Sequence, residues 1–266
     1  MANAPDETLP ALIRRARLRL LDLHRQAHAG HLGGNLSCID CLIVLHHEVL
    51  RPDDIFLLSK GHSAGALYTT LWSRGVLSEE ELSTFTRDGT RLGVHPPINE
   101  PEIAPFGTGS LGHGPSLTAG MALGQRLKGK EGRVFCLCSD GEWQEGACWE
   151  ALIFAVHQRL ANLRLIIDAN GWQGFGSTSE VASMPPRALA ARIEAFGAEV
   201  SLCDGHDPLA MLRLLTAPDD EQLRPRVILL ETCKGRGLCS LENTLASHYL
   251  PLSEEQYQLA RKGLEG

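Results

Sequence analysis

The chain has 266 residues, 25 Lys and Arg against 32 Asp and Glu, and a formal net charge of -7. This length can bury the core of one large α/β domain, and we expect a single domain over residues 1–266. The acidic balance disfavours nucleic acid or an anionic membrane surface as partner. No apolar run approaches the roughly 18 residues of a membrane span, and the first residues lack the basic and apolar stretches of a secretion signal.

In the first third of the chain, apolar spacing predicts a helix over Leu9–Ala29. Gly30–Gly34 would break that helix, and Asn35 or Ser37 would cap the next one. A short strand over Asp54–Leu58 follows, with Ser59–His62 as the turn after it. Ser63–Gly75 is expected to be helical, and Leu77–Leu82 contains the capping box of a short helix.

The eight cysteines are too few for a disulfide scaffold in a chain of this length, and a reduced, cytoplasmic protein fits them best. Cys38 and Cys41 have zinc-like spacing, but no second pair follows at zinc-ribbon distance. Their apolar surroundings predict a buried helix. Cys136 and Cys138 alternate within a predicted strand, so we interpret all four thiols as structural.

Residues 86–114 show little periodicity and are dense in Gly, Pro and His, which favours a functional loop. A helix over Ser116–Leu127 follows. The rest of the chain alternates apolar runs with helical patterns. The expected strands are 133–138, 163–168, 198–203 and 226–231, and the expected helices are 143–160, 187–196, one that follows the turn 204–208 and ends at 216, and a closing helix from 253. This alternation predicts a doubly wound α/β fold with a mainly parallel sheet and helices on both faces.

Two polar positions end neighbouring predicted strands of this sheet. Asp140 follows the first apolar run, and Asn170 follows the next one. Ligands of open α/β sheets bind at the carboxyl ends of the strands. A carboxylate and an amide oxygen that meet there suit a hard divalent cation holding a diphosphate.

Six of the eleven histidines fall in turns flanked by Gly or Pro, or in the C-terminal tail: His31, His62, His95, His113, His206 and His248. Several of these follow predicted strands and would face one mouth of the sheet. Imidazoles there suit a sugar, because they donate to or accept from hydroxyls and move protons near neutral pH. His206 is interpreted as structural. Lys234–Gly237, which we place after an edge strand, is predicted either as a phosphate clamp or as a flexible turn.

The segments Ser139–Ala151, Leu160–Leu163 and Asp168–Asn170 closely resemble the thiamine-diphosphate motif of the transketolase family. Flanking segments continue the resemblance in the same order over nearly the whole chain: Ala29–Gly34, Ser59–Ser63, His95–Pro96, Thr108–Gly114, Asp204–Asp207, Lys234–Gly237, Leu241–Asn243 and His248. The similarity is to the amino-terminal, diphosphate-binding half, and in particular to the smaller subunit of split transketolases.

The resemblance implies roles for individual residues. Asp140, Asn170 and the backbone carbonyl of Trp172 would coordinate Mg²⁺, or Ca²⁺ or Mn²⁺ in substitution. The implied cofactor contacts are His62, Gly109, Leu111, Gly112, His113, Gly141, Glu142 and Asn170. The implied catalytic residues, which would line the substrate channel, are His31, His62, His95 and His248. Glu145 would lie at a subunit interface. His113 stands where many relatives have Gln, and Ser139 replaces the usual first glycine.

The implied activity is transfer of a two-carbon ketol unit from a ketose donor to an aldehyde acceptor. In this family the glutamate that activates thiamine diphosphate lies on a separate pyrimidine-binding domain, for which we find no counterpart here. The expected partner is therefore a C-terminal transketolase subunit, in an α2β2 assembly. Two alternatives stay open: another thiamine-diphosphate transferase, resembling deoxyxylulose-phosphate synthase or an E1 component, and a non-catalytic regulatory subunit. A nucleotide-binding Rossmann protein is disfavoured because no Gly-x-Gly-x-x-Gly turn follows the first strand.

Overall fold

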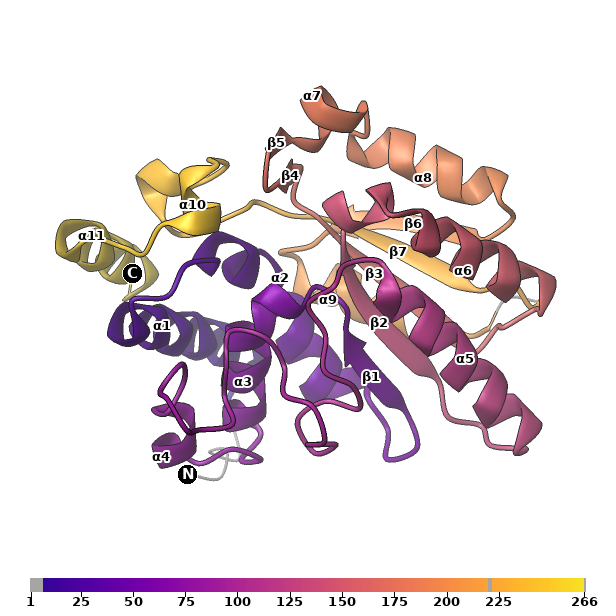
Figure 1. Ribbon diagram of the computed structural model, residues 1–266, viewed down its shortest axis with the longest axis horizontal. Coiled ribbons are helices and arrows are strands. Elements are labelled where there is room, and N and C mark those ends of the chain that lie inside the picture. Colours follow the sequence, from indigo (N-terminus) through magenta and orange to yellow (C-terminus); the bar gives the residue numbers. More distant parts are fainter. Residues whose placement is uncertain (1–6, 220–221, 266) are drawn as a thin grey trace.

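The computed structural model describes residues 7–219 and 222–265. Its centre is a five-stranded parallel sheet in the order β1-β2-β3-β7-β6 (Figure 1). The strands are β1 (Ile55–Leu58), β2 (Val134–Ser139), β3 (Leu163–Ala169), β6 (Glu199–Asp204) and β7 (Arg226–Glu231). A separate antiparallel pair consists of β4 (Trp172–Gln173) and β5 (Gly176–Ser177). The predicted parallel sheet is confirmed.

Helices cover both faces of the sheet (Figure 1). One face carries α5 (His113–Leu127), α6 (Gly146–His157) and α8 (Pro186–Ala195). The other carries α1 (Leu9–Ala27), α2 (Leu32–Val44), α3 (Ala64–Ser73) and α9 (Pro208–Thr216). Along β3, Leu165 and Ile167 pack into the first layer, whereas Ile166 packs into the second. Because both faces of the inner strands β2, β3 and β7 are buried, these strands are largely continuous apolar runs, which is why their positions could be predicted.

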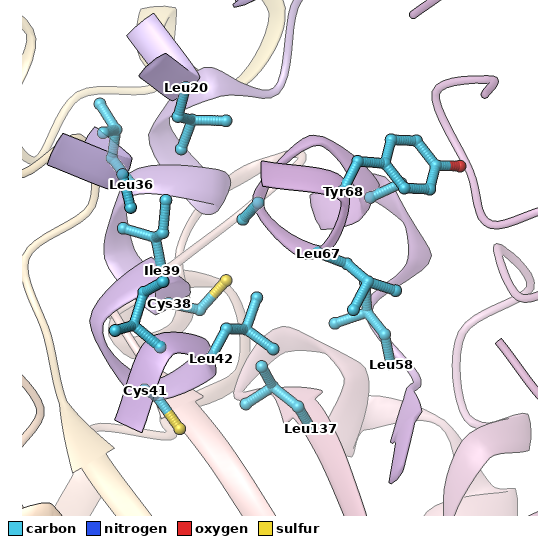
Figure 2. Packing of buried hydrophobic residues seen from close by; sticks show 14 of the residues in the cluster. Leu20, Leu36, Cys38, Ile39, Cys41, Leu42, Leu58, Leu67, Tyr68 and Leu137 are labelled. Atoms are coloured by element: carbon cyan, nitrogen blue, oxygen red, sulfur yellow. The ribbon is translucent and has the colours of Figure 1, made fainter. Parts of the chain in front are cut away.

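Helix α2 is buried on all sides, as the absence of a polar face in its sequence requires. Figure 2 shows Leu36, Ile39 and Leu42 of this helix among side chains from α1, α3 and the sheet. Cys38 and Cys41 lie in the same core, and burial raises the pKa of the Cys38 thiol to about 11. The buried-helix interpretation of these two cysteines is confirmed.

The predicted cap of α2 is wrong. The helix begins at Leu32, directly after His31, whose φ is +63°. Asn35 therefore lies inside the helix, where its amide nitrogen donates to the carbonyl oxygens of His31 and His62 at 2.9 and 3.0 Å. Ser37 is also inside the helix. Gly33 is present for a close approach rather than for a break, because a Cβ there would lie 2.4 Å from the hydroxyl oxygen of Ser247.

Other elements differ from the prediction mainly at their ends. The described residues 83–112 contain neither helix nor strand, as expected. Between the predicted strand 163–168 and the predicted helix 187–196, the structure also contains β4, β5 and α7 (Thr178–Ala182). Strand β7 is an inner strand between β3 and β6, so the prediction of an edge strand there is wrong. The remaining helices are α4 (Glu79–Leu82), which has the predicted capping box, α10 (Ala246–Tyr249) and α11 (Glu254–Glu265). Short 3-10 or π turns are Leu45–Val49, Gly61–Ser63, Gly141–Gln144 and Cys239–Leu241.

Within the described part of the chain, no helix combines the length and apolar character needed to cross a membrane.

Stability should fall in mild acid because of His24 on α1. Its side chain is buried, its Nε2 has no hydrogen-bond partner among the residues that the structure describes, and burial lowers its pKa to about 4. The unfolded chain binds a proton at this residue below pH 6.5, whereas the folded chain does so only near pH 4. The free energy of unfolding therefore falls as pH drops below 6.5, by about 1–2 kcal/mol at pH 5 from this residue.

Urea unfolding at pH 7.5 and pH 5 would measure this contribution. His24→Leu should show a smaller loss of stability between the two pH values than the wild type. An equal loss in both proteins would contradict the assignment.

Candidate active site

A cavity of about 420 Å³ opens at the carboxyl ends of the strands, within the range of about 300–1,000 Å³ typical of small-molecule sites. Its walls include the four histidines predicted to be catalytic, His31, His62, His95 and His248. A larger hollow of about 630 Å³ lies at the opposite end of the sheet, near Arg126 and His157. We place the candidate site in the smaller cavity because the strand ends and the histidines converge there.

Asp140 follows β2 and is fully buried beneath the cavity. One carboxylate oxygen accepts from the backbone N–H of Gly141 at 2.8 Å, and the other accepts from Gly171 at 2.7 Å. The carboxylate therefore bridges the turns that follow β2 and β3. Burial, and then the charge of Asp168, raise the pKa of Asp140 to about 7. A bound cation would relieve this penalty on the ionised form.

The side-chain orientation of Asn170 is fixed by its neighbours. Its amide nitrogen lies 3.1 Å from a carboxylate oxygen of Asp168, to which it donates, and its oxygen accepts from Trp172 N–H at 3.0 Å. The amide oxygen is therefore on the side of Trp172, which lines the cavity together with Asn170. This arrangement leaves a second lone pair of the oxygen free for a cation.

Sequence analysis missed the buried ion pair between Lys60 and Asp168 beneath these residues. Both side chains are fully buried, and the ammonium also donates to the carbonyl oxygen of Gly34 at 3.0 Å. Ser37 donates to the same carboxylate at 2.6 Å. Although burial alone would raise the pKa of Asp168, Lys60 holds it below its ordinary value. The sequence places Lys60 just after one predicted strand and Asp168 at the end of another, but it does not indicate that the two strands lie close enough for the pair to form.

Three of the histidine rings form a cluster. The ring centroids of His31 lie 5.6 Å from His62 and 5.1 Å from His248, and those of His62 and His248 are 5.9 Å apart. Burial lowers the pKa of each of these rings and of His95 below the ordinary value. The rings are thus neutral at pH 7, and each can donate one hydrogen bond and accept another. Nδ1 of His31 is buried and has no hydrogen-bond partner within the described ranges 7–219 and 222–265.

Lys234, from the loop after β7, contributes an ammonium group to this cavity. Its Nζ donates to Nδ1 of His248 at 2.8 Å, which leaves the imidazole proton of His248 on Nε2. Burial, and then the charge of Lys60, lower the pKa of Lys234 to about 8. Burial and Lys234 lower the pKa of His248 to about 3. Lys234 is therefore a buried cation within the site, which disfavours the prediction of a flexible turn.

The titration of His248 should report on this contact. In Lys234→Met the neighbouring positive charge is gone, so the pKa of His248 should rise above about 3 while staying below 6.5 because of burial. Long-range ¹H–¹⁵N NMR would follow the ring, with His157 on the far side of the protein as an internal control. An unchanged pKa of His248 would contradict the contact.

The loop before α5 approaches the site through its backbone. Gly109 and Gly112 have φ values of +154° and +86°. Gly109 and Leu111 line the cavity. The carboxylate of Glu142 is buried and accepts from Gly112 N–H at 2.8 Å, so it ties this loop to the turn after β2 instead of facing the cavity. His113 is exposed at the start of α5 and is outside the cavity lining. The cofactor contacts implied for Gly112, Glu142 and His113 stay predictions.

Three further side chains near the cavity lie in different environments. Glu145 is exposed at the cavity rim, a place from which it could contact another subunit. Trp143 is fully buried and packs edge-on against Trp149, with ring centroids 5.1 Å apart. It therefore belongs to the core beneath α6 and is outside the cavity lining. Phe175 is 88% exposed at the cavity mouth.

Known proteins of similar sequence point to the same kind of site as this geometry. Residues 10–265 match the family described as "Transketolase, thiamine diphosphate binding domain". The chain belongs to the transketolase family. It is 35% identical over 263 residues to an apulose-4-phosphate transketolase subunit of Phocaeicola vulgatus, covering 96% of this chain and 92% of that one. It is 36% identical over 245 residues to a 6-deoxy-6-sulfo-D-fructose transketolase subunit of a Clostridium species, covering 89% and 88%.

Solved transketolases share the fold. The enzyme from Campylobacter jejuni superposes with a TM-score of 0.86 at 28% identity, over 97% of this chain and 42% of that one. The Pichia stipitis enzyme in complex with sedoheptulose 7-phosphate gives 0.88 at 25% identity, over 98% and 41%. The chain thus spans about two fifths of the length of these transketolases, whereas it spans nearly all of the relatives named as subunits.

The residues present fit the cofactor of this family. The buried carboxylate of Asp140 has hydrogen-bond donors but no cation paired with it among the described residues. The backbone around it is close-packed, because a Cβ on Gly141 would lie 2.9 Å from the Cβ of Gln173. A Cβ on Gly112 would lie 2.6 Å from the Cβ of Glu145. Only glycine suits these two positions, and a cation bridging to phosphate suits Asp140.

Proposed function

We propose that this chain is the amino-terminal subunit of a two-component transketolase, which transfers a two-carbon ketol unit with thiamine diphosphate. One observation carries the proposal: the buried carboxylate of Asp140 lies beneath a cavity that is lined by the amide of Asn170, the ammonium of Lys234 and four neutral histidines. The first two suit a metal-bound diphosphate, and the histidines suit the hydroxyl groups of a sugar.

Asp140, Asn170 and the backbone carbonyl of Trp172 would hold Mg²⁺, for which Ca²⁺ or Mn²⁺ could substitute. Lys234 would add a positive charge near the diphosphate. When bound, the cofactor would supply the nucleophilic carbon and the electron sink that cleavage of a ketose carbon–carbon bond requires.

The chain's own residues would orient the sugar and handle its protons. The contact with Lys234 leaves His248 with a proton on Nε2, so this ring donates to a substrate oxygen. His31, His62 and His95 can each donate and accept at hydroxyl groups, because burial keeps them neutral. A neutral ring can take up a hydroxyl proton, which a protonated ring cannot.

The proposed partner is a C-terminal subunit that carries the pyrimidine-binding domain. Two relatives that align over most of their length are named as transketolase subunits, which supports this division. We propose an α2β2 assembly in the cytoplasm, with Glu145 at the contact between subunits. The exposed position of Glu145 at the cavity rim supports that placement.

A donor screen with the reconstituted pair tests the function. Apulose 4-phosphate and 6-deoxy-6-sulfo-D-fructose, named for the relatives, would be offered beside common ketoses with an aldehyde acceptor. Mass spectrometry should detect an acceptor extended by two carbons. Acyl transfer from a 2-oxo acid without ketol transfer would instead favour the alternative thiamine-diphosphate transferase.

A further inference from the structure

A partly buried chain of hydrogen bonds lies behind the cavity and ends at the loop that carries Lys234. Arg17 on α1 donates to both carboxylate oxygens of Asp40 on α2, at 2.8 and 2.7 Å. Nδ1 of His206, from the turn after β6, lies 2.9 Å from one of those oxygens. The backbone N–H of Cys233 donates to Nε2 of the same ring at 3.0 Å. His206 thus connects the Arg17–Asp40 pair to the residue that precedes Lys234.

These partners determine the tautomer of His206. Since Cys233 N–H is a donor, Nε2 must be the acceptor, and the ring proton must be on Nδ1, where it donates to Asp40. Nη2 of Arg17 also lies 3.3 Å from Nδ1, but a neutral ring cannot accept at both nitrogens. The Asp40 carboxylate stays ionised, because Arg17 and His206 hold its pKa below the ordinary value against the effect of burial.

The loop between Cys233 and Arg236 is held at both ends by this network. His206 binds the N–H of Cys233, and Nη1 of Arg17 donates to the carbonyl oxygen of Arg236 at 2.9 Å. Between them, Gly235 N–H donates to the carbonyl oxygen of Gly33 at 2.9 Å. The side chain of Lys234 leaves this fixed turn and reaches His248 in the cavity.

We propose that His206 is a positioning residue: by accepting from Cys233 N–H it holds the ammonium of Lys234 in the cavity. A role of the Lys234 ammonium in catalysis rests on the proposed function, but its placement by His206 does not. His206 is outside the cavity lining, so its effect on the site would pass through Lys234. Its sequence context, a turn between β6 and α9, gives no sign of this link, which depends on β6 and β7 being adjacent.

Two substitutions at His206 distinguish the role of Nε2 from the role of Nδ1. His206→Gln can place an acceptor oxygen near the position of Nε2 and so keep the bond to Cys233. His206→Asn keeps a donor toward Asp40 but is too short to reach Cys233. Competitive labelling of Lys234 with an amine reagent across pH, quantified by mass spectrometry on the full chain, gives the titration midpoint of this lysine.

In the wild type, the labelling midpoint of Lys234 should lie near pH 8, because burial and the charge of Lys60 lower its pKa to about 8. His206→Asn should shift the midpoint upward by about one pH unit, toward the ordinary value for lysine, as the ammonium gains water. His206→Gln should stay close to the wild type. The same midpoint in all three proteins would overturn the proposal, whatever the chain's function.

Two further measurements keep the test decisive. NMR of the wild-type ring should show Nδ1 protonated and Nε2 free of a proton, and the opposite tautomer would overturn the proposal even if His206→Asn failed to fold. With the partner subunit present, thiamine diphosphate should bind about tenfold more weakly to His206→Asn than to His206→Gln, as expected for one lost hydrogen bond. If no variant and no wild-type sample binds the cofactor, the proposed function fails while the labelling result still decides the positioning role.

Discussion

Asp140→Asn should abolish metal-dependent binding of thiamine diphosphate while leaving the chain folded. The substitution keeps the size of the side chain but removes the negative charge that a divalent cation requires. Changes to residues that merely support a metal ligand already weaken binding by about 10–100-fold, so loss of a ligand should exceed that range. Calorimetric titration of the reconstituted pair with cofactor and Mg²⁺ measures the effect.

The fold should survive Asp140→Asn because two effects oppose each other. One backbone N–H, of Gly141 or Gly171, loses its acceptor, but a carboxylate whose ionised form is disfavoured by burial is also removed. Asp53→Asn is the matched control, because it makes the same change of charge at an exposed position before β1. Cofactor binding by Asp140→Asn equal to that of the control would refute the metal assignment.

Lys60→Met should destabilise the chain by about 3–5 kcal/mol, the largest stability effect we expect. The change leaves the carboxylate of Asp168 buried without its cation, although Ser37, Asn170 and Thr232 still donate to it. Loss of one partner from a buried ion pair is costly because the remaining charge cannot return to water. Urea unfolding at pH 7.5 measures the free energy difference.

A double-mutant cycle with Asp168→Asn distinguishes charge from packing. The double variant should be less destabilised than the sum of the two single changes, because no uncompensated charge is left. Arg25→Met, which breaks an exposed ion pair with Glu254, should change stability far less. Additive effects of Lys60→Met and Asp168→Asn would show that the pair is not coupled.

The sequence predicted what depends on local pattern. The apolar runs before Asp140 and after Leu160 identified β2 and β3, and the polar residues at their ends indicated the site. Sequence also predicted that several turn histidines face one mouth, and the structure places four of them in one cavity. These inferences succeed because buried parallel strands are continuous apolar runs with ligand sites at their carboxyl ends.

What the sequence did not predict depends on tertiary proximity. Lys60 meets Asp168 because β1 and β3 flank β2, a strand order that no local pattern specifies. Gly33 was interpreted as a helix break, whereas its lack of a side chain admits Ser247 from the C-terminal segment. Lys234 enters the cavity because β7 is an inner strand, and an edge strand would have left its loop at the periphery.

The central claim is that this chain binds thiamine diphosphate as one half of a divided active site. The most direct test is calorimetric titration of the cofactor with Mg²⁺, first into this chain alone and then into its complex with the protein encoded next to its gene. We predict tight binding in the complex and weak binding by the chain alone, with binding by the complex lost in Asp140→Asn. No binding in either sample, with both proteins folded and associated, would contradict the claim.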